Sequence, residues 1–375
     1  MKLVIGKETL NAEKRVAASP ETVRKLSALG FEVGVQAGAG LTAAVTDEMY
    51  QTAGAKILSG DNVYADADVV LRVHHPSNDE IAGMKKGAVL IAQLSPYQEK
   101  DMLHALATQG VTAFSMELVP RITRAQSMDV LSSQANLAGY RAVLEAAAVF
   151  GRAFPLMMTA AGTVPPAKVF VMGAGVAGLQ AIATARRLGA QISATDVRPV
   201  AKEQVESLGA TFVMVENEET KAAETAGGYA KEMSDDYKRQ QAELIAETIK
   251  KQDIVITTAL IPGRAAPVLV TEEMVRSMKQ GSVIVDLAVE QGGNCTLSKP
   301  GEIVEVNGVS IVGHLNMPSR IAVDASALYA RNLYNFLTPL VDAETKTLKI
   351  NREDEIVKAS LVTADGQIVH PNFQS

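Results

Sequence analysis

The residues with the clearest chemical spacing are three glycines, Gly173, Gly175 and Gly178, which follow the apolar run KVFVM and precede a helical pattern. In such a GxGxxG loop the first glycine permits a tight turn, and the second lets the backbone approach a pyrophosphate. The third lets the helix and the strand pack closely, and N–H groups at the helix start bind the phosphate charge. The spacing therefore predicts a dinucleotide site, whereas a glycine turn that serves only packing is the structural alternative.

Asp196 indicates which dinucleotide binds. It ends the next apolar run, QISATD, about 20 residues after Gly175, which is typical of dinucleotide-binding folds. A carboxylate there accepts hydrogen bonds from the adenosine ribose and repels a 2′-phosphate, so the sequence favours NAD(H) over NADP(H). Arg198 argues the other way, because an arginine near this position sometimes binds that phosphate. We expect nucleotide contacts from Gly173, Gly175, Val176, Ala177, Gly178, Asp196, Val197, Arg198, Tyr229, Ala259 and Leu260.

A second group of polar residues lies in the segment PRITRAQSMDVLSS, namely Arg121, Gln126, Asp129 and Ser132. A guanidinium, an amide and a carboxylate can together orient a carboxamide and a ribose, and ligands often bind where domains meet. From the residues alone this site is only a candidate, and a solvated loop between domains is the interpretation that the residues favour.

A third feature is the long charged segment 216–240, which has Gly227, Gly228 and Tyr229 at its centre. Such a segment is either a lid that closes over the nucleotide, with Tyr229 as its contact, or an ordinary surface excursion. No spacing of the five histidines resembles a zinc site, and we expect no metal.

The elements that must position these residues alternate between short β-branched runs and helical patterns, from residue 1 to about 116 and again from Lys168. This alternation predicts an α/β fold with two Rossmann-like, doubly wound parallel-sheet domains joined by long helices. We expect one domain, without a glycine fingerprint, at residues 1–131 and 322–375, and an NAD-binding domain at 132–321. Near the end, LKINREDEIVKASLVTADGQIVH alternates and contains Asp365-Gly366, which predicts a C-terminal β-hairpin. That hairpin is either an arm that pairs with another subunit or an ordinary edge hairpin.

Composition excludes several classes of protein. The chain has 375 residues, 47% hydrophobic and 21% charged, which is typical of a folded protein with more than one domain. A net charge of −6 without a basic cluster argues against a nucleic-acid partner. No run of about 18 apolar residues occurs, so we expect no membrane span.

Several stretches closely resemble the NAD(H)-binding component, domain I of the alpha subunit, of proton-translocating NAD(P) transhydrogenases. They are MELVPRITRAQSMDVLSSQANLAGYRAV, MMTAAGTVPPAKVFVMGAGVAGLQAIATARRLGA, TDVRPVAKEQVESLGA, TAGGYAKEM and VDLAVEQGGN. The resemblance implies that the loop with Gln126 positions the nicotinamide and that Tyr229 closes on the nucleotide. It also implies NADP(H) on a partner domain of a beta subunit, membrane subunits that translocate protons, a homodimer, and a peripheral location at the cytoplasmic face of the inner membrane.

More distantly, KETLNAEKRVAASP, QAGAGL, ITTALIPG and MKQGSVIVDLAVEQGG resemble alanine dehydrogenase, which makes an amino-acid oxidoreductase the alternative function. At the position of that family's catalytic histidine this chain has Ser95, and at that of its substrate lysine it has His74. Arg15 matches the arginine that binds the substrate carboxylate. We therefore expect the amino-acid chemistry to be lost, whereas direct hydride transfer between two nicotinamides needs no side-chain base.

Overall fold

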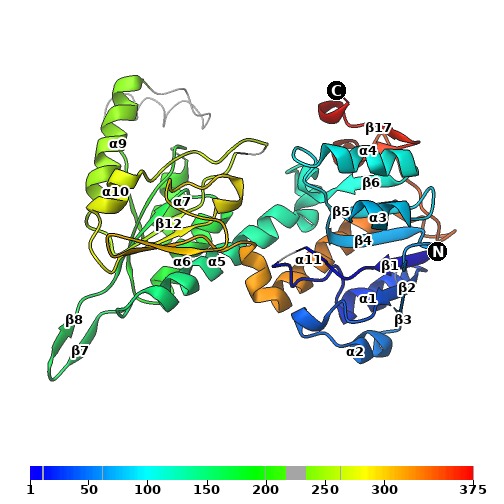
Figure 1. Ribbon diagram of the computed structural model, residues 1–375, viewed down its shortest axis with the longest axis horizontal. Helices are drawn as coiled ribbons and strands as arrows, with labels where there is room; N and C mark the ends of the chain where they lie inside the picture. The colour runs from blue at the N-terminus through cyan, green and yellow to red at the C-terminus, as the bar shows by residue number, and fades with distance from the viewer. Residues whose placement is uncertain (11, 61, 199, 217–233, 262, 375) are drawn as a thin grey trace. The chain divides into compact units, whose positions relative to one another are not determined.

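The computed structural model describes residues 1–374 apart from 11, 61, 199, 217–233 and 262. The described residues form two compact units (Figure 1). Unit 1 comprises residues 1–134 and 318–375, and unit 2 comprises residues 135–317. Among the described residues, no helix combines the length and the apolar character that a membrane crossing requires.

Unit 1 is built on a mostly parallel sheet in the order β17-β16-β6-β5-β4-β1-β2-β3. Its strands are β1 (Lys2–Ile5), β2 (Glu32–Gln36), β3 (Lys56–Leu58), β4 (Val69–His74), β5 (Val89–Gln93), β6 (Thr112–Ser115), β16 (Leu361–Ala364) and β17 (Gln367–Ile368). Its helices are α1 (Pro20–Ala28), α2 (Asp47–Thr52), α3 (Asn78–Ala82), α4 (Lys100–Gln109), α11 (Ala322–Leu337) and α12 (Glu355–Ser360), with 3₁₀ turns η1 (Leu41–Ala43), η2 (Met116–Leu118), η3 (Thr123–Met128), η6 (Thr338–Leu340) and η7 (Pro371–Phe373). The strand order reverses between β1 and β4, as in doubly wound folds.

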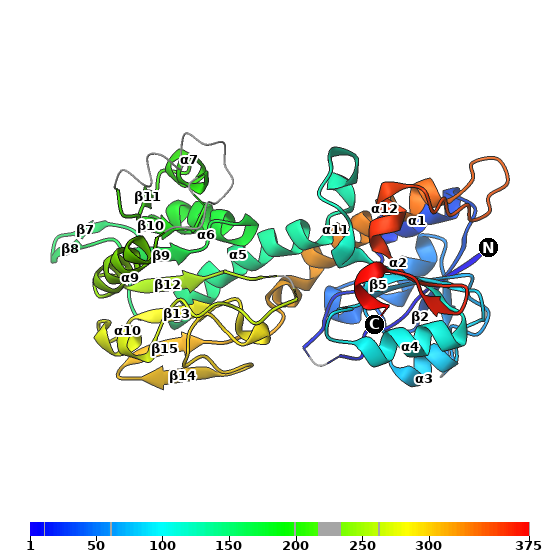
Figure 2. The same ribbon diagram turned by 90° about the horizontal axis from the view of Figure 1, so that it is seen from above.

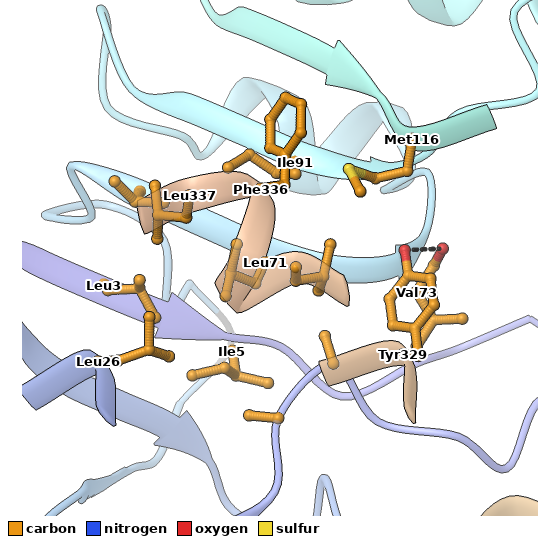
Figure 3. Close-up of a cluster of buried hydrophobic side chains, with 14 of the residues drawn as sticks. Leu3, Ile5, Leu26, Leu71, Val73, Ile91, Met116, Tyr329, Phe336 and Leu337 are labelled. Atoms are coloured by element: carbon orange, nitrogen blue, oxygen red, sulfur yellow. Dashed lines mark hydrogen bonds between the residues drawn. The ribbon is translucent and has the colours of Figure 1, made fainter. Parts of the chain in front are cut away.

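Two apolar layers hold unit 1 together, one on each face of its sheet. Alternate strand residues point to opposite faces, so Leu3 and Ile5 join the layer under α1, α2 and α11, while Val4 joins the layer under α3 and α4. Figure 3 shows the first layer, where Tyr329 of α11 donates a hydrogen bond to the carbonyl oxygen of Val73 at 3.2 Å. Because both faces are buried, these strands read as nearly continuous apolar runs.

Unit 2 has its own sheet, in the order β11-β10-β9-β12-β13-β15-β14 (Figure 2). Its strands are β9 (Lys168–Met172), β10 (Gln191–Thr195), β11 (Thr211–Phe212), β12 (Ile254–Thr257), β13 (Val283–Asp286), β14 (Ile303–Val306) and β15 (Val309–Val312). One face of this sheet is covered by α5 (Val130–Val149), α6 (Val176–Arg187) and α7 (Ala201–Ser207). The other face is covered by α9 (Asp235–Ile249) and α10 (Glu272–Ser277). The boundary between the units lies within α5. The 3₁₀ turn η4 (Val289–Gln291) also belongs to unit 2, and η5 (Met317–Ile321) contains the second boundary between the units. The expected α/β class with Rossmann-like parallel sheets is confirmed.

The C-terminal hairpin is also present. Asp365 and Gly366 both have positive φ, 54° and 76°, which gives the two-residue turn between β16 and β17. The hairpin lies at an edge of the unit 1 sheet, because β16 pairs antiparallel with β6 of the same unit. The residues just before the hairpin also alternate in the sequence, but in the structure they form a short helix, α12. Its first turn is capped by the Asp354 carboxylate.

Two features of unit 2 differ from the sequence prediction. Strands β7 (Met157–Thr159) and β8 (Gly162–Val164) form a separate two-stranded hairpin. Strand β14 adds an antiparallel edge beside β15. Its side chains alternate between exposed and half-buried, unlike those of the buried parallel strands beside it.

Candidate functional site

The glycine loop of unit 2 connects β9 to α6, as the spacing predicted. Gly173 has φ of 105°, a conformation that other residues rarely adopt, and it makes the tight turn. A Cβ placed on Gly178 would lie 1.8 Å from the carbonyl oxygen of Gly173, so only glycine fits there. A Cβ on Gly175, by contrast, would meet no atom of the described residues within 4 Å, so the described part of the chain leaves open space in front of the loop.

Helix α6 begins at Val176 without a side-chain cap from the described residues. Its first N–H groups, from Val176 to Gly178, therefore face the space beside Gly175 with the positive end of the helix dipole. Helix α5 packs against the same turn, because a Cβ on Gly139 would lie 2.0 Å from the carbonyl oxygen of Ala177. Gly139 could not be singled out from the sequence, since its role depends on this tertiary contact.

Asp196 lies directly after β10, beside the glycine loop. Its carboxylate accepts hydrogen bonds from the backbone N–H of Ala174 at 2.7 Å and from that of Arg198 at 2.8 Å. The Arg198 guanidinium also pairs with it, through Nε at 2.9 Å and Nη2 at 3.1 Å. Burial alone would raise the pKa of the Asp196 carboxyl, but these hydrogen bonds outweigh that effect and hold the pKa below its usual range. Asp196 is therefore ionised at neutral pH.

Arg198 is engaged on the loop itself. Besides the three hydrogen bonds that Arg198 donates to Asp196, its Nη2 lies 3.3 Å from the carbonyl oxygen of Ala174. The adjacent Val197 has 87% of its surface exposed. An arginine held in this way is less available to a 2′-phosphate than a free one.

The loop after β12 completes this edge of the sheet. Thr258 donates through Oγ1 to the Gly173 carbonyl oxygen at 3.0 Å, and Ala259 donates its N–H to Asn294 Oδ1 at 3.0 Å. Asn294 also donates to the Ala259 carbonyl oxygen at 2.9 Å, and its N–H is held by the fully buried carboxylate of Asp286 at 3.2 Å. The stretch VDLAVEQGGN contains both of these supporting residues, but its sequence pattern did not indicate their role.

Two further nucleotide contacts were expected, at Leu260 and Tyr229, and the structure describes only the first of these residues. Leu260 follows Ala259 and is 48% exposed, although it is a large apolar side chain. Tyr229 lies outside the described residues. The structure therefore brings together the glycine loop, Asp196, Arg198 and the Ala259 loop within unit 2.

The predicted polar loop lies in unit 1, around η3. Arg121 and Gln126 are exposed, and neither side chain has a hydrogen bond or an ion pair with another described residue. Asp129 is different, because it accepts from the N–H of Ser132 at 2.8 Å and from its hydroxyl at 2.6 Å. Asp129 and Ser132 thereby cap the start of α5, which is a sufficient structural reason for both residues.

Unit 1 also contains a buried charged cluster at the ends of its parallel strands. Arg15 binds Glu13 through Nε at 2.9 Å and Nη2 at 2.7 Å, and Gln134 through Nη1 at 2.9 Å. His74 Nε2 lies 2.8 Å from the same Glu13 carboxylate, and Ser319 donates to it at 3.1 Å. The side chains of Arg15 and Glu13 are 4% and 0% exposed. The positive charge of Arg15 is thus neutralised inside the protein.

The described residues contain no group of three or more side chains arranged to hold a metal ion. Cys295 is buried, and burial raises the pKa of its thiol to about 11. A thiol with so high a pKa is a poor nucleophile at neutral pH.

Comparison with known proteins identifies the family. A family model described as "Alanine dehydrogenase/PNT, N-terminal domain" matches residues 4–138, and one described as "Alanine dehydrogenase/PNT, C-terminal domain" matches residues 142–371. An NAD(P) transhydrogenase alpha subunit of Rhodospirillum rubrum is 59% identical over 377 residues, covering 99% of this chain and 98% of the relative. The crystal structure of a transhydrogenase from Sinorhizobium meliloti matches with a TM-score of 0.91 at 57% identity, over 98% of this chain and 100% of that one.

Alanine dehydrogenases match at greater distance. The enzyme of Bacillus subtilis is 30% identical, covering 98% of this chain and 93% of the relative. The chain therefore belongs to the alanine dehydrogenase/PNT family.

Proposed function

We propose that this chain is the NAD(H)-binding subunit of a proton-translocating transhydrogenase. In this proposal it presents NADH for direct hydride transfer to NADP⁺ held on a partner subunit. The observation that carries the proposal is the open glycine loop beside Asp196, in a chain similar over nearly its whole length to transhydrogenase alpha subunits.

In this proposal the glycine loop holds the nucleotide by its backbone. The N–H groups at Gly175, Val176 and Ala177 bind the pyrophosphate, because the helix dipole favours negative charge there. Asp196 accepts from the adenosine ribose, and Arg198 and Val197 lie against the adenosine. Ala259, Leu260 and Tyr229 are the remaining proposed contacts. When bound, NADH supplies a hydride from C4 of its dihydronicotinamide.

Arg121 and Gln126 are the proposed orienting residues. Their exposure, and the absence of bonds to other described residues, leaves both side chains available to the nicotinamide. Asp129 and Ser132 support them by fixing the start of α5. None of these residues needs to move a proton, because hydride transfer between two nicotinamide rings is balanced without one.

The proposed partners are the NADP(H)-binding domain of a beta subunit, the proton-translocating membrane subunits, and a second copy of this chain. The relatives are named as alpha subunits, which supports an assembly. The β7–β8 hairpin supports the homodimer, because isolated two-stranded hairpins are marginally stable in water and this one exposes Met158 to 81%. Membrane subunits would hold the chain at the cytoplasmic face of the inner membrane.

The alternative is an amino-acid oxidoreductase, which the alanine dehydrogenase relatives and Arg15 favour. Its substrate carboxylate would have to displace Glu13, which makes two side-chain contacts with Arg15 in a buried site. Removing one partner from a buried ion pair is costly, so we expect L-alanine with NAD⁺ and the purified chain to yield no NADH.

The testing experiment mixes the chain with the NADP-binding domain of a related transhydrogenase and follows NADPH formation from NADH. We expect NADPH with the unmodified chain, and a single-turnover rate about tenfold lower for Gln126→Ala with NADH affinity within about twofold. Gln51→Ala, at another exposed glutamine of unit 1, serves as the control. Absence of NADPH with the unmodified chain refutes the function, and an unchanged rate for Gln126→Ala refutes only its orienting role.

A further inference from the structure

The loop that carries Arg121 and Gln126 contains only a short 3₁₀ turn, so contacts with the rest of unit 1 must hold its conformation. Ile122, Ala125 and Met128 follow each other at intervals of three and pack into the core of unit 1, which matches the period of a 3₁₀ turn. This apolar face anchors one side of the loop to the core of unit 1. It leaves the polar residues between these positions on the outer side, where packing does not hold them.

One of those outer residues, Arg124, is pinned to the C-terminal segment. Its Nη1 and Nη2 bind the two carboxylate oxygens of Asp354 at 2.9 and 3.0 Å, a bidentate geometry that fixes direction as well as distance. Asp354 is itself fixed, because the same carboxylate accepts from the N–H of Ile356 at 2.8 Å and caps α12. The two residues lie 230 positions apart in the chain.

A second anchor lies on the other side of Gln126. The carbonyl oxygen of Ser127 accepts from Asn332 at 2.8 Å and from Asn335 at 3.1 Å, both on α11. Asn332, which is 7% exposed, also accepts from the Ser133 hydroxyl at 2.7 Å. Gln126 therefore lies between Arg124, which is bonded to the segment before α12, and Ser127, which is bonded to α11.

We propose that Arg124 and Asp354 are positioning residues for hydride transfer, and that the C-terminal segment serves as the brace of the Gln126 loop. This inference rests on the proposed function. Neither residue needs to touch the nucleotide. The pair acts through Gln126 and Arg121, whose backbone it holds while their side chains stay available.

The test uses Arg124→Gln and Asp354→Asn in the full chain. Asparagine at 354 still caps α12, so the second variant removes the charge and one acceptor but keeps the helix start. Arg331→Gln is the matched control, because Arg331 is 50% exposed against 51% for Arg124 and binds Glu21, which is not part of the loop. Amide hydrogen exchange of residues 121–128 and single-turnover NADPH formation are the two measurements.

We expect the backbone amides of residues 121–128 to exchange faster in both variants. We expect hydride transfer to be about fivefold slower, because the lost ion pair is bidentate but exposed and so has a modest effect. NADH affinity and thermal midpoint should match those of Arg331→Gln, and Arg124→Lys should recover part of the rate. Exchange or transfer rates equal to the control's overturn the proposal. If the unmodified chain transfers no hydride, the proposed function fails, and the exchange measurement alone decides whether the pair holds the loop.

Discussion

Both units have polar groups near the ends of their parallel strands, but the two regions differ in whether these groups are bonded to one another. In unit 1 the side chains of Arg15, Glu13 and His74 contact one another inside the protein. In unit 2, among the residues that the structure describes, the loop after β9 has open space at Gly175 and no side chain caps the helix start at Val176. The same sheet architecture thus yields one closed region and one open region, so ligand binding depends on whether the protein satisfies its own polar groups.

Glu13→Gln tests how firmly the first region is closed, and we expect it to have the largest effect. It leaves Arg15 buried without its counter-charge, so the free energy of unfolding should fall by about 3 kcal/mol in urea titrations. Glu32→Gln is the control, because Glu32 forms an exposed pair with Lys56, and its unfolding midpoint should barely change. A loss no greater than the control's would mean that the cluster contributes little to stability.

The same cluster gives a pH dependence. Burial would raise the pKa of Glu13, but hydrogen bonds from His74 and Arg15 outweigh it and leave the pKa well below the usual 4.5. A lowered folded-state pKa contributes stability above the unfolded-state value and loses it as the pH falls. The stability difference between the unmodified chain and Glu13→Gln should therefore be constant above about pH 5 and shrink below it. A difference that grows on acidification would contradict the assigned direction.

Gly175→Val tests the openness of the second region. The backbone there is extended, with φ of −75° and ψ of −169°, so valine should fold normally while its side chain fills the space in front of the loop. We expect NADH affinity to fall about 100-fold, measured by calorimetry. Gly151→Val is the control, because a Cβ on Gly151 also meets no described atom within 4 Å. Equal affinities for the two variants would place the nucleotide elsewhere.

Asp196→Asn sharpens the comparison with a smaller change. It removes the charge that repels a 2′-phosphate and weakens the hold on Arg198, so the preference for NADH over NADPH should drop about tenfold. Glu272→Gln, which disturbs the exposed pair with Arg276, should leave that preference intact. If Asp196→Asn retains the full preference, the ribose contact has been misassigned.

The contrast between the two regions also marks how far the sequence could lead. The glycine loop and its strand were predictable because the residues that indicate them, an apolar run followed by three spaced glycines, lie within a dozen positions of the sequence. The closed cluster was not, since His74 meets Glu13 across 61 residues of chain, and no pattern near either residue indicates that contact. The β7–β8 hairpin and the edge strand β14 were missed because these strands are only three or four residues long, which is too short to establish a strand period.

The path of one hydrogen atom tests the proposed reaction most directly. NADH carrying deuterium at the transferable C4 position, mixed with this chain, an NADP-binding partner domain and NADP⁺, should give NADPH that retains the deuterium. Omitting the chain should abolish the product. NADPH that carries hydrogen from the solvent, or no NADPH at all, would contradict direct transfer from a nucleotide held at Gly175.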